Sequence, residues 1–150
     1  MNTVTTDWSG VERPCWLENA EKFTAAALCQ MQKDGWVVSL VFCDDDFIQA
    51  LNRDYRKKDE PTDVLSFPLG DSVTQDGTTS FLAGDIIISL PGLARNMADF
   101  NVGQNEELKR LIVHGLLHLA GMDHTDNSPR QPMLMLQESI LDCLSGEQIV

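Results

Sequence analysis

The sequence predicts an α+β fold, in which a small mixed β-sheet packs with about five helices around a buried central helix. Segments whose apolar residues recur at helical spacing are interrupted by short runs rich in β-branched and aromatic residues. One helical segment, residues 104–120, is apolar around nearly its whole circumference, which is typical of a buried helix. The length of 150 residues, without a linker or an internal repeat, predicts a single domain over residues 1–150.

The first half of the chain is expected to form two helices and two strands. In order, these are a helix over residues 14–32, a strand over 36–42, a helix over 44–53 and a strand over 64–67. Pro14 suits the first turn of the first helix, and Asp34-Gly35 is expected to end it. The aspartates at positions 44–46 supply an N-cap and an acidic first turn for the second helix. Pro68 is expected to close the second strand.

The second half of the chain is expected to form one strand and three helices. These are a strand over residues 81–89 and helices over residues 91–100, 104–120 and 128–144. The polar segment before the strand contains Asp76-Gly77, a pair that predicts a hairpin turn. Ser128 and Pro129 are expected to begin the last helix. The buried helix before it should hold its side chains rigidly, because it is packed on nearly all sides.

All three histidines of the chain lie within residues 114–124, in the spacing H-x-x-x-H-x-x-G-x-x-H. Positions four apart share a helix face, so His114 and His118 can direct their imidazoles to one point. Gly121 can adopt a left-handed conformation that ends the helix and brings His124 to the same point. Three imidazoles with a fourth position left for water form the pattern of a catalytic zinc site. We therefore expect one zinc ion, although imidazole ligands also suit other divalent transition metals.

The residue after the first histidine distinguishes this motif from that of the zinc peptidases. Peptidases of the H-E-x-x-H type place a glutamate there as the general base, whereas this chain has Gly115. Water must then be activated by the metal alone or by a base from elsewhere. Asp123 is the nearest carboxylate, and we expect it to orient a histidine or cap the turn. A metallopeptidase-like amide hydrolase remains an alternative.

Three blocks of sequence resemble a known family. The segment HGLLHLAGMDH at residues 114–124 is similar to H-G-x-L-H-L-x-G-Y-D-H, the signature of the YbeY family of bacterial endoribonucleases. YRKKDEPTDVLSFP at residues 55–68 and GDIIIS at residues 84–89 resemble the family blocks Y-R-x-x-D-x-P-T-D-V-L-S-F-P and G-D-I-x-I-S, in the same order. With the flanking helices, the resemblance covers nearly the whole chain. Met122 stands where the family usually has tyrosine.

The resemblance implies a function that residue spacing alone does not. It implies a metal-dependent, single-strand-specific endoribonuclease acting in rRNA processing, at the 3′ end of 16S rRNA, and in ribosome quality control. The implied partners are single-stranded RNA, rRNA, and ribosomal proteins or ribosome-associated factors. A further alternative is a ribosome assembly factor whose metal is mainly structural and whose acidic surface contacts a ribosomal protein.

The distribution of charge bears on how such an enzyme could hold RNA. The net charge is −12, whereas phosphate contacts normally require a basic face. Four of the eleven basic residues nevertheless lie between Arg53 and Lys58. We expect Arg56 to be the catalytic residue that clamps a phosphate, since its planar guanidinium suits phosphate oxygens. The alternative is a solvated helix end, where cations favour the C-terminal dipole.

Four other residues are expected to support the metal ligands or to bind substrate: Lys57, Ser66, Asp85 and Asp123. Lys57 belongs to the basic cluster, and Ser66 and Asp85 lie at ends of expected strands. Turn and strand-edge hydrogen bonding is the alternative role for Ser66 and Asp85.

The remaining composition favours a cytoplasmic protein. The chain lacks an apolar run of about 18 residues, so no membrane span is expected. Its first residues lack the basic start and the apolar stretch of a secretory signal. The four cysteines are scattered, which predicts reduced, mostly buried thiols rather than disulfides or a second zinc site.

Overall fold

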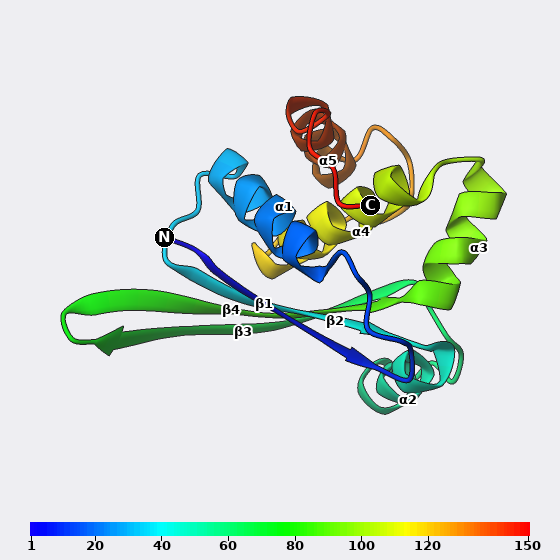
Figure 1. The fold of residues 1–150 in the computed structure, drawn as a ribbon, viewed down its shortest axis with the longest axis horizontal. Coiled ribbons are helices and arrows are strands. Elements are labelled where there is room, and N and C mark those ends of the chain that lie inside the picture. Colours follow the sequence, from blue (N-terminus) through cyan, green and yellow to red (C-terminus); the bar gives the residue numbers. More distant parts are fainter.

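The four strands of the protein form one mixed sheet in the order β1-β2-β4-β3, seen edge-on in Figure 1. The computed structural model describes residues 1–150. The strands are β1 (Thr3–Ser9), β2 (Trp36–Cys43), β3 (Val64–Gln75) and β4 (Thr78–Ser89). The first three in the spatial order run parallel, and β3 pairs antiparallel with β4 at the other edge.

Five helices flank this sheet unequally. They are α1 (Leu17–Gln30), α2 (Asp45–Arg56), α3 (Leu90–Phe100), α4 (Gln104–Leu119) and α5 (Pro132–Cys143). Helices α1, α3, α4 and α5 lie on one side of the sheet, whereas α2 lies alone on the other (Figure 1). The predicted α+β class is therefore confirmed, including the number of helices.

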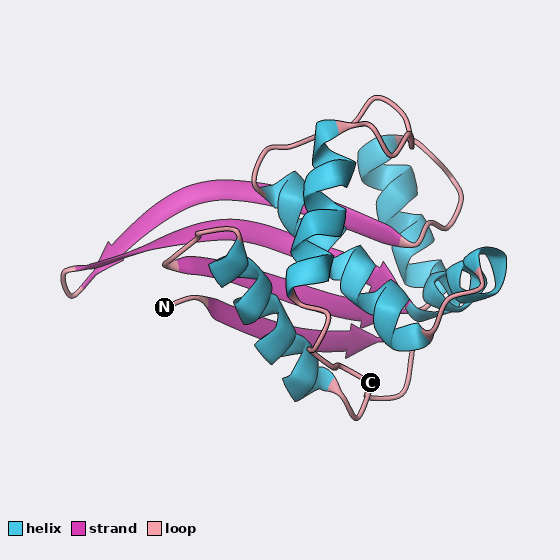
Figure 2. Ribbon diagram, turned by 90° about the horizontal axis from the view of Figure 1, so that it is seen from above, coloured by secondary structure: helices cyan, strands magenta, loops and turns pink.

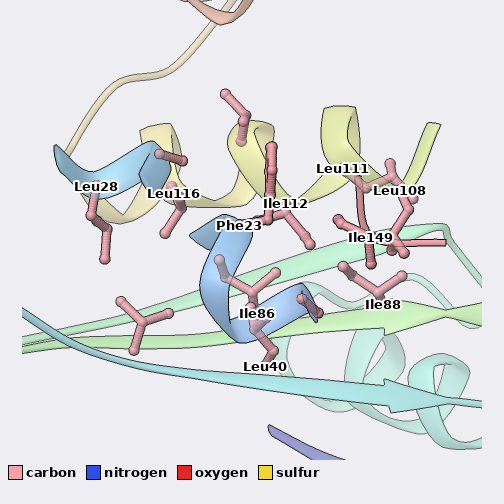
Figure 3. Packing of buried hydrophobic residues seen from close by; sticks show 14 of the residues in the cluster. Phe23, Leu28, Leu40, Ile86, Ile88, Leu108, Leu111, Ile112, Leu116 and Ile149 are labelled. Carbon is pink, nitrogen blue, oxygen red and sulfur yellow. The ribbon is translucent and has the colours of Figure 1, made fainter. Parts of the chain in front are cut away.

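Helix α4 is the centre of the main hydrophobic core. It packs between the sheet below and the helices α1 and α5 beside and above it (Figure 1). Its buried apolar residues include Leu108, Ile112 and Leu116, which lie on the side of α4 that faces Ile86 and Ile88 of the sheet in Figure 3. Each such fully buried side chain contributes about 1.5–3 kcal/mol of transfer free energy. The predicted burial of this helix is confirmed, and it makes α4 a rigid base for the side chains on its remaining face.

Alternation along β4 gives the two faces of the sheet separate cores. Ile86 and Ile88 belong to the main core on the α4 side, whereas Ile87 packs with Ile48 of α2 on the other side. This follows from the two-residue period of a strand, which sends successive side chains to opposite faces. Only the residues of β4 that alternate with Ile87, such as Ile86 and Ile88, therefore face α4.

Helix starts follow the expected chemistry at two places. Asp44 caps α2, because its carboxylate accepts a hydrogen bond from the backbone N–H of Phe47 at 2.9 Å. Ser89 caps α3 in the same way, and it also donates to Asp45 at 2.8 Å. Asp45 accepts a second contact, from Arg95 of α3, at 2.7 Å. The N-terminal end of α2 is thus tied to α3 around the end of the sheet.

The structure corrects several expected boundaries. Strand β1 was missed, although Thr3-Val4-Thr5-Thr6 is rich in β-branched residues; it is an edge strand whose side chains alternate without forming an apolar face. Helix α1 is shorter than residues 14–32, and α2 runs three residues past Arg53, to Arg56. Helix α5 begins at Pro132 rather than near Pro129.

The hairpin of β3 and β4 is also longer than expected. Pro68 does not end β3, because an edge strand tolerates proline and the pairing register shifts between Pro68 and Asp71. The turn lies at Asp76-Gly77, as predicted, and both residues have positive φ, 52° and 78°. Figure 2 shows the hairpin extending well beyond the area that the helices cover.

The structure shows the environment of the four cysteines and the character of the helices. The cysteines form no disulfide, but only Cys43 is buried, so the expectation of mostly buried thiols is wrong. No helix combines the length and the apolar composition that a bilayer-spanning segment requires.

Gly84 of β4 offers a test of how tightly this strand is packed against β3. It has a φ of +140°, and a Cβ added there would lie 2.2 Å from the carbonyl oxygen of Phe67. Gly84→Ala should therefore lower the free energy of unfolding by roughly 2 kcal/mol or more, through strain and steric overlap. Chemical denaturation of the variant measures this loss.

Gly70→Ala is the matched control, because Gly70 also has a positive φ, +75°, but has nothing within 4 Å of an added Cβ. Equal losses in the two variants would show that backbone strain alone, and not the contact with Phe67, sets the cost at Gly84.

Candidate metal centre and its cleft

The three histidines converge as their spacing predicts. His114 and His118 lie one turn apart on α4, and His124 follows in the loop after the helix. The Nε2 atoms of His114 and His118 are 3.1 Å apart. One ring nitrogen from each of the three histidines lies within 4.8 Å of the other two, and no fourth ligating side chain belongs to the group. These residues could hold a metal ion.

The opposite ring nitrogen of each histidine meets an oxygen atom. Nδ1 of His118 lies 3.1 Å from the backbone carbonyl of Met122, and Nδ1 of His124 lies 2.8 Å from that of Asp126. Carbonyl oxygens only accept hydrogen bonds, so both Nδ1 atoms carry the proton. Each Nε2 then keeps its lone pair for a metal, which is the usual arrangement of metal-binding histidines.

His114 is held in the same tautomer by a side chain of α5. Its Nδ1 lies 2.8 Å from Oε1 of Gln137. The amide of Gln137 is oriented by Glu138, whose carboxylate accepts a hydrogen bond from Nε2 of Gln137 at 3.1 Å. Three neutral imidazoles with free Nε2 atoms therefore fit a zinc ion or a similar divalent metal.

The turn that delivers His124 is built by the backbone. Gly121 has a φ of +91° and donates to the carbonyl of His118, while the N–H of Met122 donates to the carbonyl of Leu117. This pair of bonds is the Schellman ending of a helix, and it confirms the left-handed conformation predicted at Gly121. Met122 serves His118 through its backbone oxygen, so that hydrogen bond does not require the tyrosine found in the family.

Burial favours the neutral form of the two histidines on α4. Burial lowers the pKa of His114 below its ordinary value, and the neighbouring His124 acts in the same direction. Burial also lowers the pKa of His118, with His114 and His124 adding to the effect. A neutral imidazole is the form that binds a metal, so these histidines are already in the protonation state that metal binding requires.

A cleft of about 520 Å³ begins beside the histidine cluster and extends along α4 toward α3. His114 and His124 line it together with Asp63, Asn96 and Glu107. Glu107 lies seven residues before His114, which is about two helical turns along the same face of α4. Burial raises the pKa of its carboxyl group, although the hydrogen bond from Asn96 opposes this rise.

Several residues of this site, among them Glu107 and Gln137, were not expected from the sequence. Glu107 could have been predicted, because its spacing of seven residues from His114 places both on one face of the helix. Gln137 could not, because it lies on α5, and only the folded structure brings α5 to His114.

Gly115 is explained by packing. An added Cβ there would lie 2.8 Å from Cγ2 of Ile86 in the sheet. A glutamate at this position would collide with a fully buried side chain. The base of the H-E-x-x-H peptidases is therefore absent because α4 lies directly on β4 at this point.

Arg56 does not contact the histidines. It lies at the C-terminal end of α2, and its Nη2 donates to the backbone carbonyl of Ser66 at 3.3 Å. The hydroxyl of Ser66 donates in turn to the carbonyl of Gly115 at 3.4 Å. Arg56 is therefore linked to α4 across the β3 edge of the sheet. Lys57 is an exposed residue in a left-handed conformation, with a φ of 62°, that ends α2.

The two acidic residues of the predicted site have different positions. Asp123 accepts a hydrogen bond from the backbone N–H of His124 at 2.8 Å, so it caps the turn that carries the third histidine. Asp85 lies two residues before Ile87 in β4, so both side chains point to the same face of the sheet. This is the face that α2 covers, away from α4. The structure does not bring Asp85 to the histidines.

A buried helix and the turn after it bring three histidines together beside an open cleft, above a small mixed sheet, and three histidines without a fourth protein ligand are the pattern of a hydrolase that uses a bound metal. The family model described as Endoribonuclease YbeY matches residues 5–145. The chain belongs to the endoribonuclease YbeY family, and it is therefore an enzyme of the hydrolase class.

Individual relatives agree with this assignment. A protein of Treponema denticola named Endoribonuclease YbeY is 57% identical over 122 residues, which cover 81% of this chain and 79% of the relative. One of Treponema pallidum with the same name is 49% identical over 142 residues, covering 94% and 89% of the two chains. A solution structure of a Thermotoga maritima protein superimposes with a TM-score of 0.64 at 28% identity, covering 98% of this chain and 91% of that one.

The hydrogen bond from His114 to Gln137 should contribute to metal affinity. Gln137→Leu keeps much of the side-chain volume but removes the acceptor that fixes the His114 tautomer. Zinc affinity should fall by about 10–100-fold, as for other residues that orient metal ligands. Competition with a zinc chelator of known affinity measures the change.

Gln30→Leu, at an exposed position of α1, is the control and should leave the zinc affinity unchanged. His118→Ala should remove the bound ion altogether. A Gln137→Leu protein that binds zinc as tightly as the unmodified protein would rule out this role for Gln137.

Proposed function

We propose that residues 1–150 form one domain that acts as a metal-dependent, single-strand-specific endoribonuclease, with one zinc ion held by His114, His118 and His124. The observation that carries this proposal is the convergence of three histidines, each with an oxygen at Nδ1, of which His114 and His124 line an open cleft. A structural zinc site is normally closed by a fourth protein ligand, and this cluster has only three. The endoribonuclease name of the family and of its relatives supplies the substrate class.

The proposed chemistry divides the work between the metal and the protein. When bound, the metal supplies Lewis acidity that activates water and offsets charge on a phosphate oxygen. The protein holds the three imidazoles in one tautomer, two of them on the buried helix α4 and the third in the turn after it. Asp123 and Gly121 hold the turn that delivers His124.

Arg56 is proposed to hold the scissile phosphate from the β3 edge. Its side chain is exposed, and the carbonyl of Ser66 accepts one of its N–H groups. A guanidinium has five N–H donors, so the others remain free for the two parallel bonds that suit a phosphate. Ser66 positions this arginine through its backbone oxygen. Lys57 and Lys58 add positive charge for neighbouring phosphates.

We infer further that the enzyme processes ribosomal RNA in the cytoplasm, at the 3′ end of 16S rRNA, and takes part in ribosome quality control. The support is the resemblance of the three sequence blocks to the family. A net charge of −12 leaves a largely acidic surface that suits basic ribosomal proteins or associated factors as partners.

The two alternative functions are less well supported. A peptidase would need a general base that Gly115 cannot supply and that Ile86 leaves no room for. An assembly factor with a structural metal would be expected to close its site with a fourth ligand.

The first prediction from this function concerns substrate class. The zinc-loaded protein should cleave single-stranded RNA and should not digest casein. Chelation of the metal and His114→Ala should each abolish RNA cleavage, which gel analysis of a labelled oligonucleotide measures. Casein digestion that is lost in His114→Ala, by a preparation that leaves RNA intact, would reverse the assignment in favour of a peptidase.

The second prediction concerns Arg56. Arg56→Lys retains the charge but lacks the planar pair of donors, so it should lower the rate of the chemical step by roughly 10²–10³-fold. It should weaken RNA binding much less. Single-turnover cleavage and equilibrium binding, measured on the same oligonucleotide, separate the two effects.

Lys57→Ala and Lys58→Ala are the matched controls for charge. Each should mainly raise the RNA concentration needed, and each should reduce the salt dependence of binding by about one phosphate contact. Zinc content and thermal stability should be unchanged in all three variants. Full single-turnover activity in Arg56→Lys would leave Arg56 as a helix-end cation.

A further inference from the structure

The end of the cleft away from the histidines has a polar wall with unused hydrogen-bonding capacity. Asn96 donates through its Nδ2 to Asp63 at 2.9 Å and to Glu107 at 3.0 Å. Both N–H groups of this amide are therefore used, and its carbonyl oxygen remains available as an acceptor. Asp63, Asn96 and Glu107 thus offer oxygen atoms to anything that enters the cleft, and Arg110 is the cation that lines it beside them.

Glu107 is the unusual member of this wall. Its side chain is only 3% exposed, and its Oε1 has no hydrogen-bond partner. The nearest cation is Nη1 of Arg110, at 3.5 Å. Nε and Nη2 of the same guanidinium donate to the carboxylate of Glu138 at 3.3 and 2.9 Å, and Nη1 makes an ion-pair contact with Glu107 but no hydrogen bond. A buried carboxylate oxygen without a donor is costly, so a ligand that supplies an N–H group would be favoured here.

An exposed aromatic ring lies at the same end of the cleft. Phe100 is the last residue of α3, and it lines the cleft together with Asn96, Glu107 and His124. Its side chain is 64% exposed. Large apolar side chains of this exposure need no special explanation when they are scattered, but this one borders the cleft that contains the candidate metal ligands.

We propose that this end of the cleft is a nucleobase subsite, in which Phe100 stacks on one base and the Asn96–Glu107 wall accepts hydrogen bonds from its exocyclic amino group. The proposal rests on the proposed function and names the part of the RNA that each end of the cleft takes. Aromatic stacking is the general means by which proteins hold single-stranded bases. Carboxylates accept readily from an amino group such as N4 of cytosine.

Charge separates the two ends of the cleft. The carboxylates of Asp63 and Glu107 disfavour a phosphate at the α3 end, where Arg110 is the one cation of the lining, whereas a cation held by the histidines would favour a phosphate at the other end. Glu107 and His114 are seven residues apart on α4, or about 10 Å along the helix axis. This spacing suits one nucleotide lying with its phosphate at the histidines and its base against Phe100.

The test uses the zinc-loaded, full-length protein and two single-stranded RNA probes of equal length, oligo(C) and oligo(U). The two bases have the same size and differ where cytosine has an amino group and uracil a carbonyl. The unmodified protein should bind oligo(C) roughly fivefold or more tightly than oligo(U). Phe100→Ala should weaken binding of both probes, by roughly 5- to 100-fold. Phe100→Trp should restore it.

Glu107→Gln should leave stacking intact but reduce the preference for oligo(C), because one acceptor oxygen becomes an amide. Phe47→Ala, at another exposed phenylalanine on α2, is the control and should bind both probes like the unmodified protein. Zinc content and thermal stability, measured for every variant, separate loss of the subsite from loss of the fold.

The outcomes distinguish this subsite from the function on which it rests. Unchanged binding in Phe100→Ala, or equal affinity of the unmodified protein for the two probes, would overturn the subsite while leaving the nuclease intact. A zinc-loaded protein that binds neither probe and cleaves no RNA would overturn the proposed function itself.

Discussion

The close packing of α4 on β4 is the constraint on which the rest of the structure depends. Gly115 has no side chain, and this allows the helix to lie directly against Ile86 of the sheet. The apolar residues around α4 then complete the main core, and its histidines are held on a side that still opens to solvent. The same contact excludes a glutamate at position 115. The contact between Gly115 and Ile86 thus explains both the close packing of the helix that carries His114 and His118 and the absence of a glutamate base beside His114.

The core and the site also share the helices that lie around α4. Helix α5 packs against α4 and supplies Gln137 to His114, whereas α3 supplies Asn96 and Phe100 to the far end of the cleft. The strand β3 begins at Val64, beside Asp63 in the cleft wall. Residues from four separate elements therefore meet in one cleft, although only α4 and the turn after it carry the histidines.

The sequence was sufficient for features that depend on local spacing. It predicted the buried helix, the reversal at Gly121, the cap at Asp44 and the hairpin turn at Asp76-Gly77, because each follows from the chemistry of a few adjacent residues. It was insufficient for features that depend on pairing between distant segments. The edge strand β1 lacks an apolar face, and the register shift after Pro68 is visible only once β3 is paired with β4. Asp85 was placed near the cleft because its parity in β4 could not be known without the register, and the acceptor for His114 lies on another helix.

The hydrogen bonds at Nδ1 of the histidines have a consequence for variation within such proteins. Two of the three acceptors are main-chain carbonyls, those of Met122 and Asp126, and both lie in the turn that carries His124. Every amino acid has that oxygen, so the side chain of Met122, which contributes only its carbonyl, can be replaced with little effect on ligand orientation, whereas Gly121 and Asp123 are needed for the turn itself. The length of the turn is under a different constraint, because one inserted or deleted residue would displace both carbonyls together. Divergence here is therefore expected to proceed by replacement at constant length, and the departure at Met122 is a change of this kind.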